Sequence, residues 1–351
     1  MKNILLCLVG GTICTSLNAD NTLSVDEKAG ALIKSNFEKS NSPFVEKVHI
    51  DLTENLFILS ENMTVEKWNA IIETYIRYTT KKKYDGVIFA HGTDTLAYSA
   101  ALFSMLLCKT DIPVFFVSSH KRLDAADANG NENFKCAVEW IARGISPNVY
   151  VTYKNPSDGR MYLHIASRLE QCKNYSDDFY SRDMLDITDI SEENRERYLE
   201  RIALLYPPQK KKAFLDIYNC PKLKESVLLL QPYVGINYDA YDFARFKAVL
   251  HLTFHSGTAC AEKNGPNSIL HMIKRCEETE TPIDLYLSPA KLSGEIYETI
   301  REIGRKKIKF LYGYTAEIAY AKLLIAYSCF ENEKERIDFI TTECNFENIE
   351  K

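Results

Sequence analysis

The feature that most constrains this fold is a series of short, continuous apolar runs that alternate with longer amphipathic segments. Apolar residues without a polar alternation are typical of strands buried on both faces of a sheet. Five such runs occur in the first half of the chain: residues 4–9, 48–52, 86–90, 113–118 and 149–153. Between them, segments such as residues 63–83 carry apolar side chains at helical spacing, with Thr64 as a predicted N-cap. The pattern predicts an α/β protein whose parallel sheet has helices on both faces.

A change in composition divides the chain into two parts. Residues 186–224 are highly charged and contain Pro207-Pro208, which favours a helix followed by a linker. We therefore expect a larger N-terminal domain over residues 1–185, a helical linker over 186–224 and a smaller C-terminal α/β domain over 225–351. The acidic tail after Phe330 is expected to pack weakly.

Composition excludes several classes of partner. The 351 residues carry a net charge of −5, which provides no basic field for nucleic acid and is repelled by an anionic membrane. The N-terminal apolar run ends at Gly10 and fits a buried strand better than a signal peptide, and no stretch is long enough to span a bilayer. Ten cysteines without a CxxC pair are typical of reduced thiols. We expect a cytoplasmic protein.

Two of the predicted strands end in the same way, with glycine followed by threonine. The first is followed by Gly11 and Thr12, and the third by Gly92, Thr93 and Asp94. Ligands of parallel α/β sheets bind beyond the carboxyl ends of the strands, and glycine lets them approach backbone N–H groups near residues 11 and 92. Each motif alone is better explained as a turn and helix cap. Together they favour nucleophilic hydrolysis, which needs a hydroxyl, an acid and anion-stabilising N–H groups.

These motifs resemble those of the L-asparaginase family, which includes the bacterial type I and II enzymes and the related glutaminase-asparaginases. The resemblance rests on "GGTI" at residues 10–13 and "HGTDT" at 91–95, and it continues through "SENMTVEKW", "PYVGI", "FHSGTA" and "GYTAEIAYAKLL" almost to the end of the chain. It implies a two-domain fold and the hydrolysis of L-asparagine to L-aspartate and ammonia. It also implies no cofactor, no metal, and a homodimer or homotetramer.

The resemblance also implies roles for individual residues. Thr12 matches the threonine nucleophile, and Thr93 and Asp94 match the second threonine and the aspartate that binds the substrate's α-amino group. Ser60 matches a residue that binds the α-carboxylate. Glu61 stands where the family often has a neutral side chain, and its charge would repel that carboxylate unless it turned toward the ammonium.

One position departs from the family pattern. The lysine expected after Asp158-Gly159 is replaced by His164. A histidine can act as a base near neutral pH, but it is shorter than lysine, and His164 is equally explained as a polar residue on a strand. Lys121 and Lys154 are alternative bases.

Two other interpretations of the function stay open. The first is hydrolysis of another amide, such as glutamine, a D-amino acid or a peptide amide. The tRNA amidotransferase component with this fold is less favoured, because it needs an extra N-terminal domain and a partner, and Met1 stands just before the first strand. The second is a protein that binds a small amino acid with impaired catalysis, because the lysine has been lost.

Overall fold

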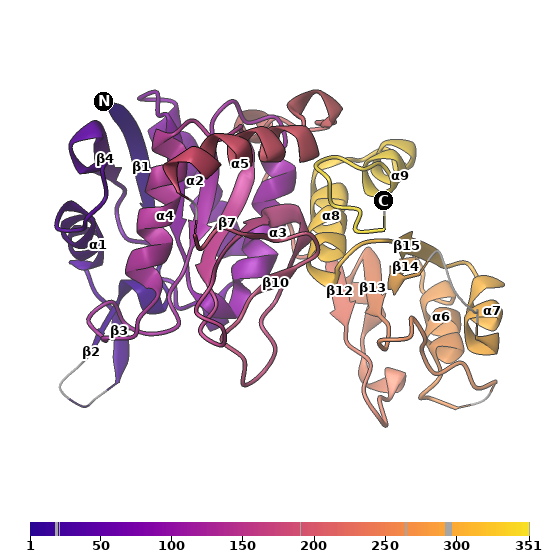
Figure 1. Cartoon of the computed structure of the whole chain (residues 1–351). Helices are drawn as coiled ribbons and strands as arrows, with labels where there is room; N and C mark the ends of the chain where they lie inside the picture. Colours follow the sequence, from indigo (N-terminus) through magenta and orange to yellow (C-terminus); the bar gives the residue numbers. More distant parts are fainter. Residues whose placement is uncertain (18–19, 21, 190, 264, 292–296, 351) are drawn as a thin grey trace. The chain divides into compact units, whose positions relative to one another are not determined.

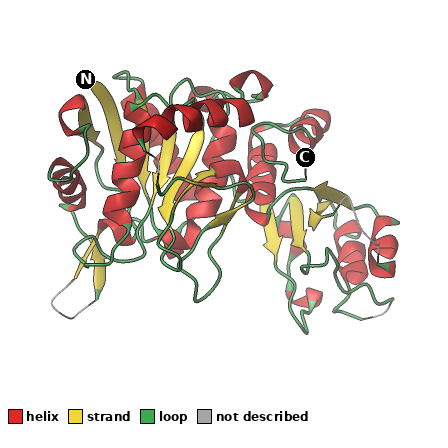
Figure 2. Cartoon of the chain, in the orientation of Figure 1, coloured by secondary structure: helices red, strands yellow, loops and turns green. Residues whose placement is uncertain are grey.

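The computed structural model describes residues 1–17, 20, 22–189, 191–263, 265–291 and 297–350 (Figure 1). The chain forms two compact units. The first comprises Met1–Cys220 with Cys344–Phe346, and the second comprises Pro221–Glu343 with Glu347–Lys351. Strands and helices alternate along the chain, as the apolar pattern predicts (Figure 2).

The first unit is built on a seven-stranded sheet in the order β11-β8-β7-β6-β5-β1-β4. Five of its strands are parallel and confirm the five predicted runs. They are β1 (Lys2–Leu8), β4 (Val48–Leu52), β5 (Gly86–Ala90), β6 (Val114–Val117) and β7 (Val149–Lys154). Two further strands, β8 (Met161–Ile165) and β11 (Leu185–Asp186), are antiparallel. β8 agrees with the interpretation of His164 as a polar residue on a strand, whereas β11 was not predicted. The sheet is therefore mixed at one edge.

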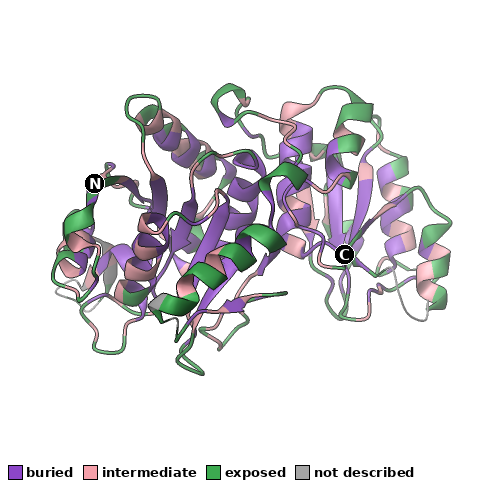
Figure 3. Ribbon diagram, turned by 45° about the horizontal axis from the view of Figure 1, so that its top comes forward, coloured by how far each residue is buried: buried purple, intermediate pink, exposed green. Residues whose placement is uncertain are grey.

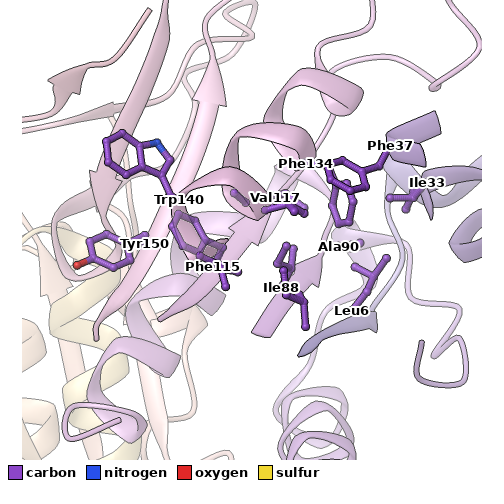
Figure 4. Packing of buried hydrophobic residues seen from close by; sticks show 14 of the residues in the cluster. Leu6, Ile33, Phe37, Ile88, Ala90, Phe115, Val117, Phe134, Trp140 and Tyr150 are labelled. Atoms are coloured by element: carbon purple, nitrogen blue, oxygen red, sulfur yellow. The ribbon is translucent and has the colours of Figure 1, made fainter. Parts of the chain in front are cut away.

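Helices cover both faces of this sheet. On one face, α1 (Ala29–Glu38) and α4 (Gly130–Ala142) share a core with alternate strand residues such as Ile88 and Phe115 (Figure 4). On the other face, Phe89 packs between Tyr75 of α2 (Val65–Thr79) and Phe103 of α3 (Leu96–Leu106). Thr64 caps α2 as predicted, because its side chain accepts from the Lys67 N–H. Short hairpins add β2 (Thr15–Leu17) with β3 (Leu23–Val25), and β9 (Leu169–Glu170) with β10 (Tyr180–Ser181).

The expected linker over 186–224 differs from what the structure contains. Residues up to Cys220 belong to the first unit. Helix α5 (Glu192–Leu205) packs there because Ile202 and the following Tyr206 are buried in the same core as α1 and α4. Tyr198 and Leu199 of the same helix are partly buried against this core, so a segment that is mostly charged still presents an apolar face to it.

The second unit contains a four-stranded parallel sheet in the order β12-β13-β14-β15. Its strands are β12 (Val227–Leu230), β13 (Ala248–Leu252), β14 (Asp284–Ala290) and β15 (Lys309–Tyr312). Its helices are α6 (Ile269–Glu277), α7 (Glu298–Gly304), α8 (Ala316–Cys329) and α9 (Glu333–Thr341). β13 is buried along its whole length, and most of α8 is buried as well (Figure 3). Among the described residues, no helix has both the length and the apolar character needed to cross a membrane.

The expectation that the tail after Phe330 packs weakly is wrong. Phe339 and Ile340 of α9 are buried, and Glu347 is fully buried. The Glu347 carboxylate lies 2.5 Å from the Lys322 Nζ of α8, and both side chains have 0% exposure. A buried carboxylate needs such a partner. Because Lys322 provides one, the acidic composition of the tail does not make its side chains exposed.

Candidate active site

The two glycine–threonine motifs meet at the carboxyl ends of neighbouring strands. β1 and β5 are paired in register up to Leu8 and Ala90, and the N–H groups of Val9 and Gly10 both donate to the Ala90 carbonyl. Beyond the strands, the backbones touch at Gly11 and Gly92. A Cβ on Gly11 would lie 2.0 Å from the Gly92 Cα, and Gly11 has a φ of 73°. Only glycine fits at position 11.

Ser60 completes the contact from a third segment. It begins the 3₁₀ turn Ser60–Asn62, and a Cβ on Gly92 would lie 2.4 Å from its hydroxyl oxygen. The Ser60 hydroxyl donates to the Asp94 carboxylate at 3.2 Å and accepts from the Asp94 N–H at 3.3 Å. The Thr95 hydroxyl donates to the Ser60 carbonyl at 2.9 Å. Ser60 is therefore fixed against the second threonine motif.

These hydrogen bonds weigh against the capping explanation of Thr93-Asp94-Thr95. Helix α3 begins at Leu96, as that explanation requires. However, the N-cap residues of α3 and of the preceding 3₁₀ turn Thr93–Thr95 provide no side-chain cap bond. The Asp94 and Thr95 side chains bond to Ser60 instead. Their polar groups link two loops of the candidate site.

The exposed groups of the site lie above a buried floor. Gly11, Gly92 and Ser60 are buried, whereas Thr12 and Thr93 are partly exposed. Asp94 and Glu61 are exposed. A small molecule can therefore reach the two threonines and both carboxylates from solvent.

The expected anion-binding N–H groups need one correction. The Gly11 N–H donates to the Ile58 carbonyl at 2.9 Å, so it is not available to an oxyanion. Thr12 and Thr93 are each the first residue of a 3₁₀ turn, Thr12–Cys14 and Thr93–Thr95. The first N–H groups of a helical turn have no acceptor within it. The amides of these two threonines are the candidate oxyanion donors.

Gln171 is a site residue that the sequence analysis missed. Its side-chain amide donates to the Thr93 carbonyl at 2.8 Å and accepts from the Ala97 N–H at 3.3 Å. It thereby holds the turn that carries Thr93 against the start of α3. No motif marks Gln171, because its position depends on the path of the chain after β8.

His164 lies inside the sheet and does not hydrogen-bond to Thr93. It pairs with Val151 on β7, which pairs with Phe116 on β6, which in turn pairs with Phe89 on β5. Side chains paired in this way project from the same face. His164 therefore faces the layer of α3, the helix that follows Thr93. Its Nδ1 lies 2.8 Å from the Ser181 hydroxyl, and its Nε2 has no hydrogen-bond partner among the described residues.

The three candidate bases, His164, Lys121 and Lys154, are each limited by burial or by an ion pair. Complete burial lowers the pKa of His164 to about 3, so the imidazole is neutral at physiological pH and accepts a proton poorly. Lys121 pairs with Asp127, and the Lys154 Nζ lies 2.7 Å from the Glu132 carboxylate. Both lysine side chains are thus engaged in ion pairs with carboxylates. Within the described ranges, no group of three or more metal-ligating side chains is arranged to hold an ion.

His91 supports the glycine contact from below. It is fully buried directly before Gly92, and its Nδ1 lies 2.8 Å from the Gly92 carbonyl oxygen. Its ring packs edge-on against Phe116. Burial lowers the pKa of His91 to about 4, which keeps this side chain neutral inside the sheet.

Known proteins resemble this chain in sequence. Residues 3–202 match the family described as Asparaginase, N-terminal. Relatives named as a component of glutamyl-tRNA(Gln) amidotransferase are 23% identical over 253 residues in Thermococcus kodakarensis and 24% identical over 325 residues in Pyrococcus abyssi. These alignments cover 72% and 90% of this chain, respectively. The chain spans only 55% of the length of the Thermococcus relative and 69% of the Pyrococcus one.

Solved structures confirm the expected two-domain fold. The thermostable L-asparaginase from Thermococcus kodakarensis has a TM-score of 0.71 at 17% identity, covering 97% of each chain. L-asparaginase I from Vibrio cholerae has a TM-score of 0.67 at 20% identity, covering 99% of this chain and 98% of that one. Because the family match extends over more than half of the residues, the chain belongs to the asparaginase family.

Proposed function

We propose that this protein hydrolyses the side-chain amide of a small amino acid, L-asparagine above all, to L-aspartate and ammonia. The observation that carries the proposal is the contact between Gly11 and Gly92. It holds Thr12 and the Thr93-Asp94 pair at one solvent-facing edge of the sheet.

The geometry supports the following mechanism. The Thr12 hydroxyl attacks the amide carbon, and the amides of Thr12 and Thr93 stabilise the oxyanion. The C–N bond then breaks, and the proton lost by the Thr12 hydroxyl passes to the leaving nitrogen, which departs as ammonia. Water hydrolyses the acyl-threonine to aspartate and returns a proton to the Thr12 oxygen. The exposed Asp94 carboxylate binds the substrate ammonium.

Proton transfer is the weakest part of this site. An efficient general base has a pKa near the working pH, whereas burial lowers the pKa of His164 to about 3. Asp94, held by Ser60, is the site carboxylate next to Thr93 and takes part in proton handling. We therefore expect slow turnover.

Two alternatives follow from specific observations. The relatives named as amidotransferase components favour glutamine as the amide source. The buried, weakly basic His164 favours a protein that binds a small amino acid without hydrolysing it.

Ammonia release from L-asparagine, L-glutamine and D-asparagine by the purified chain tests the proposal, with Thr12→Ala as the matched inactive variant. L-asparagine is expected to be the best substrate and Thr12→Ala to be inactive. Turnover that survives Thr12→Ala would refute the nucleophile assignment. If L-aspartate raises the melting temperature while no amide is hydrolysed, the binding alternative is correct.

A further inference from the structure

The second unit contains a cavity of about 630 Å³ at the amino-terminal edge of its sheet. Lys224 precedes β12 by three residues, Lys247 stands directly before β13, and Asp284 is the first residue of β14. All three line the cavity. Every lining residue belongs to the second unit, whereas the threonine motifs belong to the first.

The lining is strongly cationic although the whole chain carries a net charge of −5. Its charged members are four cations and two carboxylates: Lys224, Arg245, Lys247, Arg336, Asp284 and Glu331. Asp284 is already neutralised, because Lys309 Nζ lies 2.8 Å from one carboxylate oxygen and the Tyr327 hydroxyl donates to the other. Burial opposes the ionisation of Asp284, but these bonds outweigh it and keep its pKa below the usual range.

The cations are available to a ligand. Within the part of the chain that the structure describes, Lys224, Arg245 and Lys247 are exposed and form no ion pair. Arg336 is held in place, because its Nη1 donates to the carbonyls of Phe330 and Glu331 and its guanidinium lies 5.2 Å from the centre of the Tyr327 ring.

Arg336 also carries a donor that needs an acceptor. Its Nε is buried and has no hydrogen-bond partner among the described residues. A buried charged donor without an acceptor is costly, and planar guanidinium groups suit the oxygens of phosphate or carboxylate.

We propose that this cavity binds a small phosphate monoester. Because Lys309 neutralises Asp284, the four cations of the lining face one uncompensated carboxylate, Glu331. This cationic excess favours a phosphate monoester, with its charge of roughly −1.5 to −2, over a ligand with a single carboxylate. The volume lies in the range of about 300–1,000 Å³ that is typical of small-molecule sites. Phe246, Tyr327 and Phe330 line the cavity and provide contacts for the rest of the molecule. The site is independent of the function proposed for the first unit.

The test measures binding of inorganic pyrophosphate, as a probe, to the full chain by calorimetry and hydrogen–deuterium exchange. The variant is K224Q/K247Q, which removes two exposed charges whose side chains hold no part of the fold. The matched control, K263Q/R301Q, removes two exposed charges that do not line the cavity. The expected result is protection near the starts of β12 and β13, with a Kd about tenfold higher in the variant and unchanged in the control.

Three outcomes would overturn the proposal. The first is no binding of pyrophosphate by the unmodified chain at millimolar concentrations. The second is equal weakening in K224Q/K247Q and in the control, which would indicate a general charge effect. The third is binding of succinate, or of a single-stranded oligonucleotide, at this edge without binding of pyrophosphate. Arg336→Gln provides an independent variant, for which loss of pyrophosphate binding with an unchanged circular dichroism spectrum is expected.

Discussion

Replacing Gly11 with alanine is expected to disrupt the active site more than any other single-methyl change. The new Cβ would lie 2.0 Å from the Gly92 Cα, whereas non-bonded carbons approach only to about 3.5–4.0 Å. Both atoms belong to backbone, so no flexible side chain can move aside. The two strand ends must separate by about 1.5–2 Å to restore normal contact.

Gly144→Ala provides a matched control in the same unit. Gly144 has a φ of 80°, close to the 73° of Gly11, but a Cβ there would have nothing within 4 Å. The control therefore measures the backbone strain alone, which costs about 1–2 kcal/mol for a residue other than glycine. Gly11→Ala adds the steric overlap, and we expect a total loss in unfolding free energy above about 4 kcal/mol.

Urea unfolding followed by circular dichroism gives both losses, and ammonia release gives the effect on activity. Because a displacement of about 1 Å can reduce catalysis about 100-fold, Gly11→Ala is expected to lose at least that factor, while Gly144→Ala keeps its rate. If both variants lose the same unfolding free energy and both remain active, the Gly11–Gly92 contact does not position the threonines.

Three further predictions concern buried polar groups. His164→Lys is expected to raise kcat about 100-fold, which is the usual contribution of a positioned base, whereas His164→Gln is expected to leave kcat unchanged. Loss of activity in His164→Gln would show that the imidazole already acts as the base. Burial lowers the pKa of His91 to about 4, below the ordinary value of about 6.5, so the stability it contributes is complete above pH ~6.5 and is lost as the pH falls toward 4. As the pH falls over this range, the unfolding free energy of His91→Asn is expected to decrease by about 3 kcal/mol less than that of the unmodified chain. Equal decreases in the two proteins would contradict the assignment. Lys322→Met is expected to lower the free energy of unfolding by about 3–5 kcal/mol, and the added change Glu347→Leu is expected to restore most of this loss. A double-mutant cycle measured by urea unfolding tests this, and additive losses would mean that the pair is not coupled.

The central strands could be predicted from the sequence because burial on both faces leaves an uninterrupted apolar run. β5 was predicted with its observed bounds for this reason. β11 was missed because it has only two residues, and β8 was considered only as one of two interpretations of His164. Their pairing depends on contacts with β7 and with each other, which no local pattern records.

The same distinction applies to the site. Thr12, Thr93 and Asp94 follow directly from strand ends that the sequence marks, and parallel pairing brings those ends together. The role of Gln171 and the burial of His164 depend on how the antiparallel strand β8 leads into β9. Glu347 was misjudged for a comparable reason, because it follows the last helix and its partner Lys322 lies on α8, 25 residues earlier in the chain.

Substrate positioning and proton transfer are structurally separable in this chain. The positions of the threonines are fixed by the contact between Gly11 and Gly92 and by the bonds from Ser60 and Gln171. None of these depends on the residue at position 164. A hydrolase and an amino-acid-binding protein would therefore share the same pocket, and affinity for L-aspartate alone cannot distinguish them. Only turnover can distinguish them. Burial makes His164 a weak base, so a variant with lysine at this position is expected to differ from the present chain in its rate of hydrolysis rather than in its affinity for the amino acid.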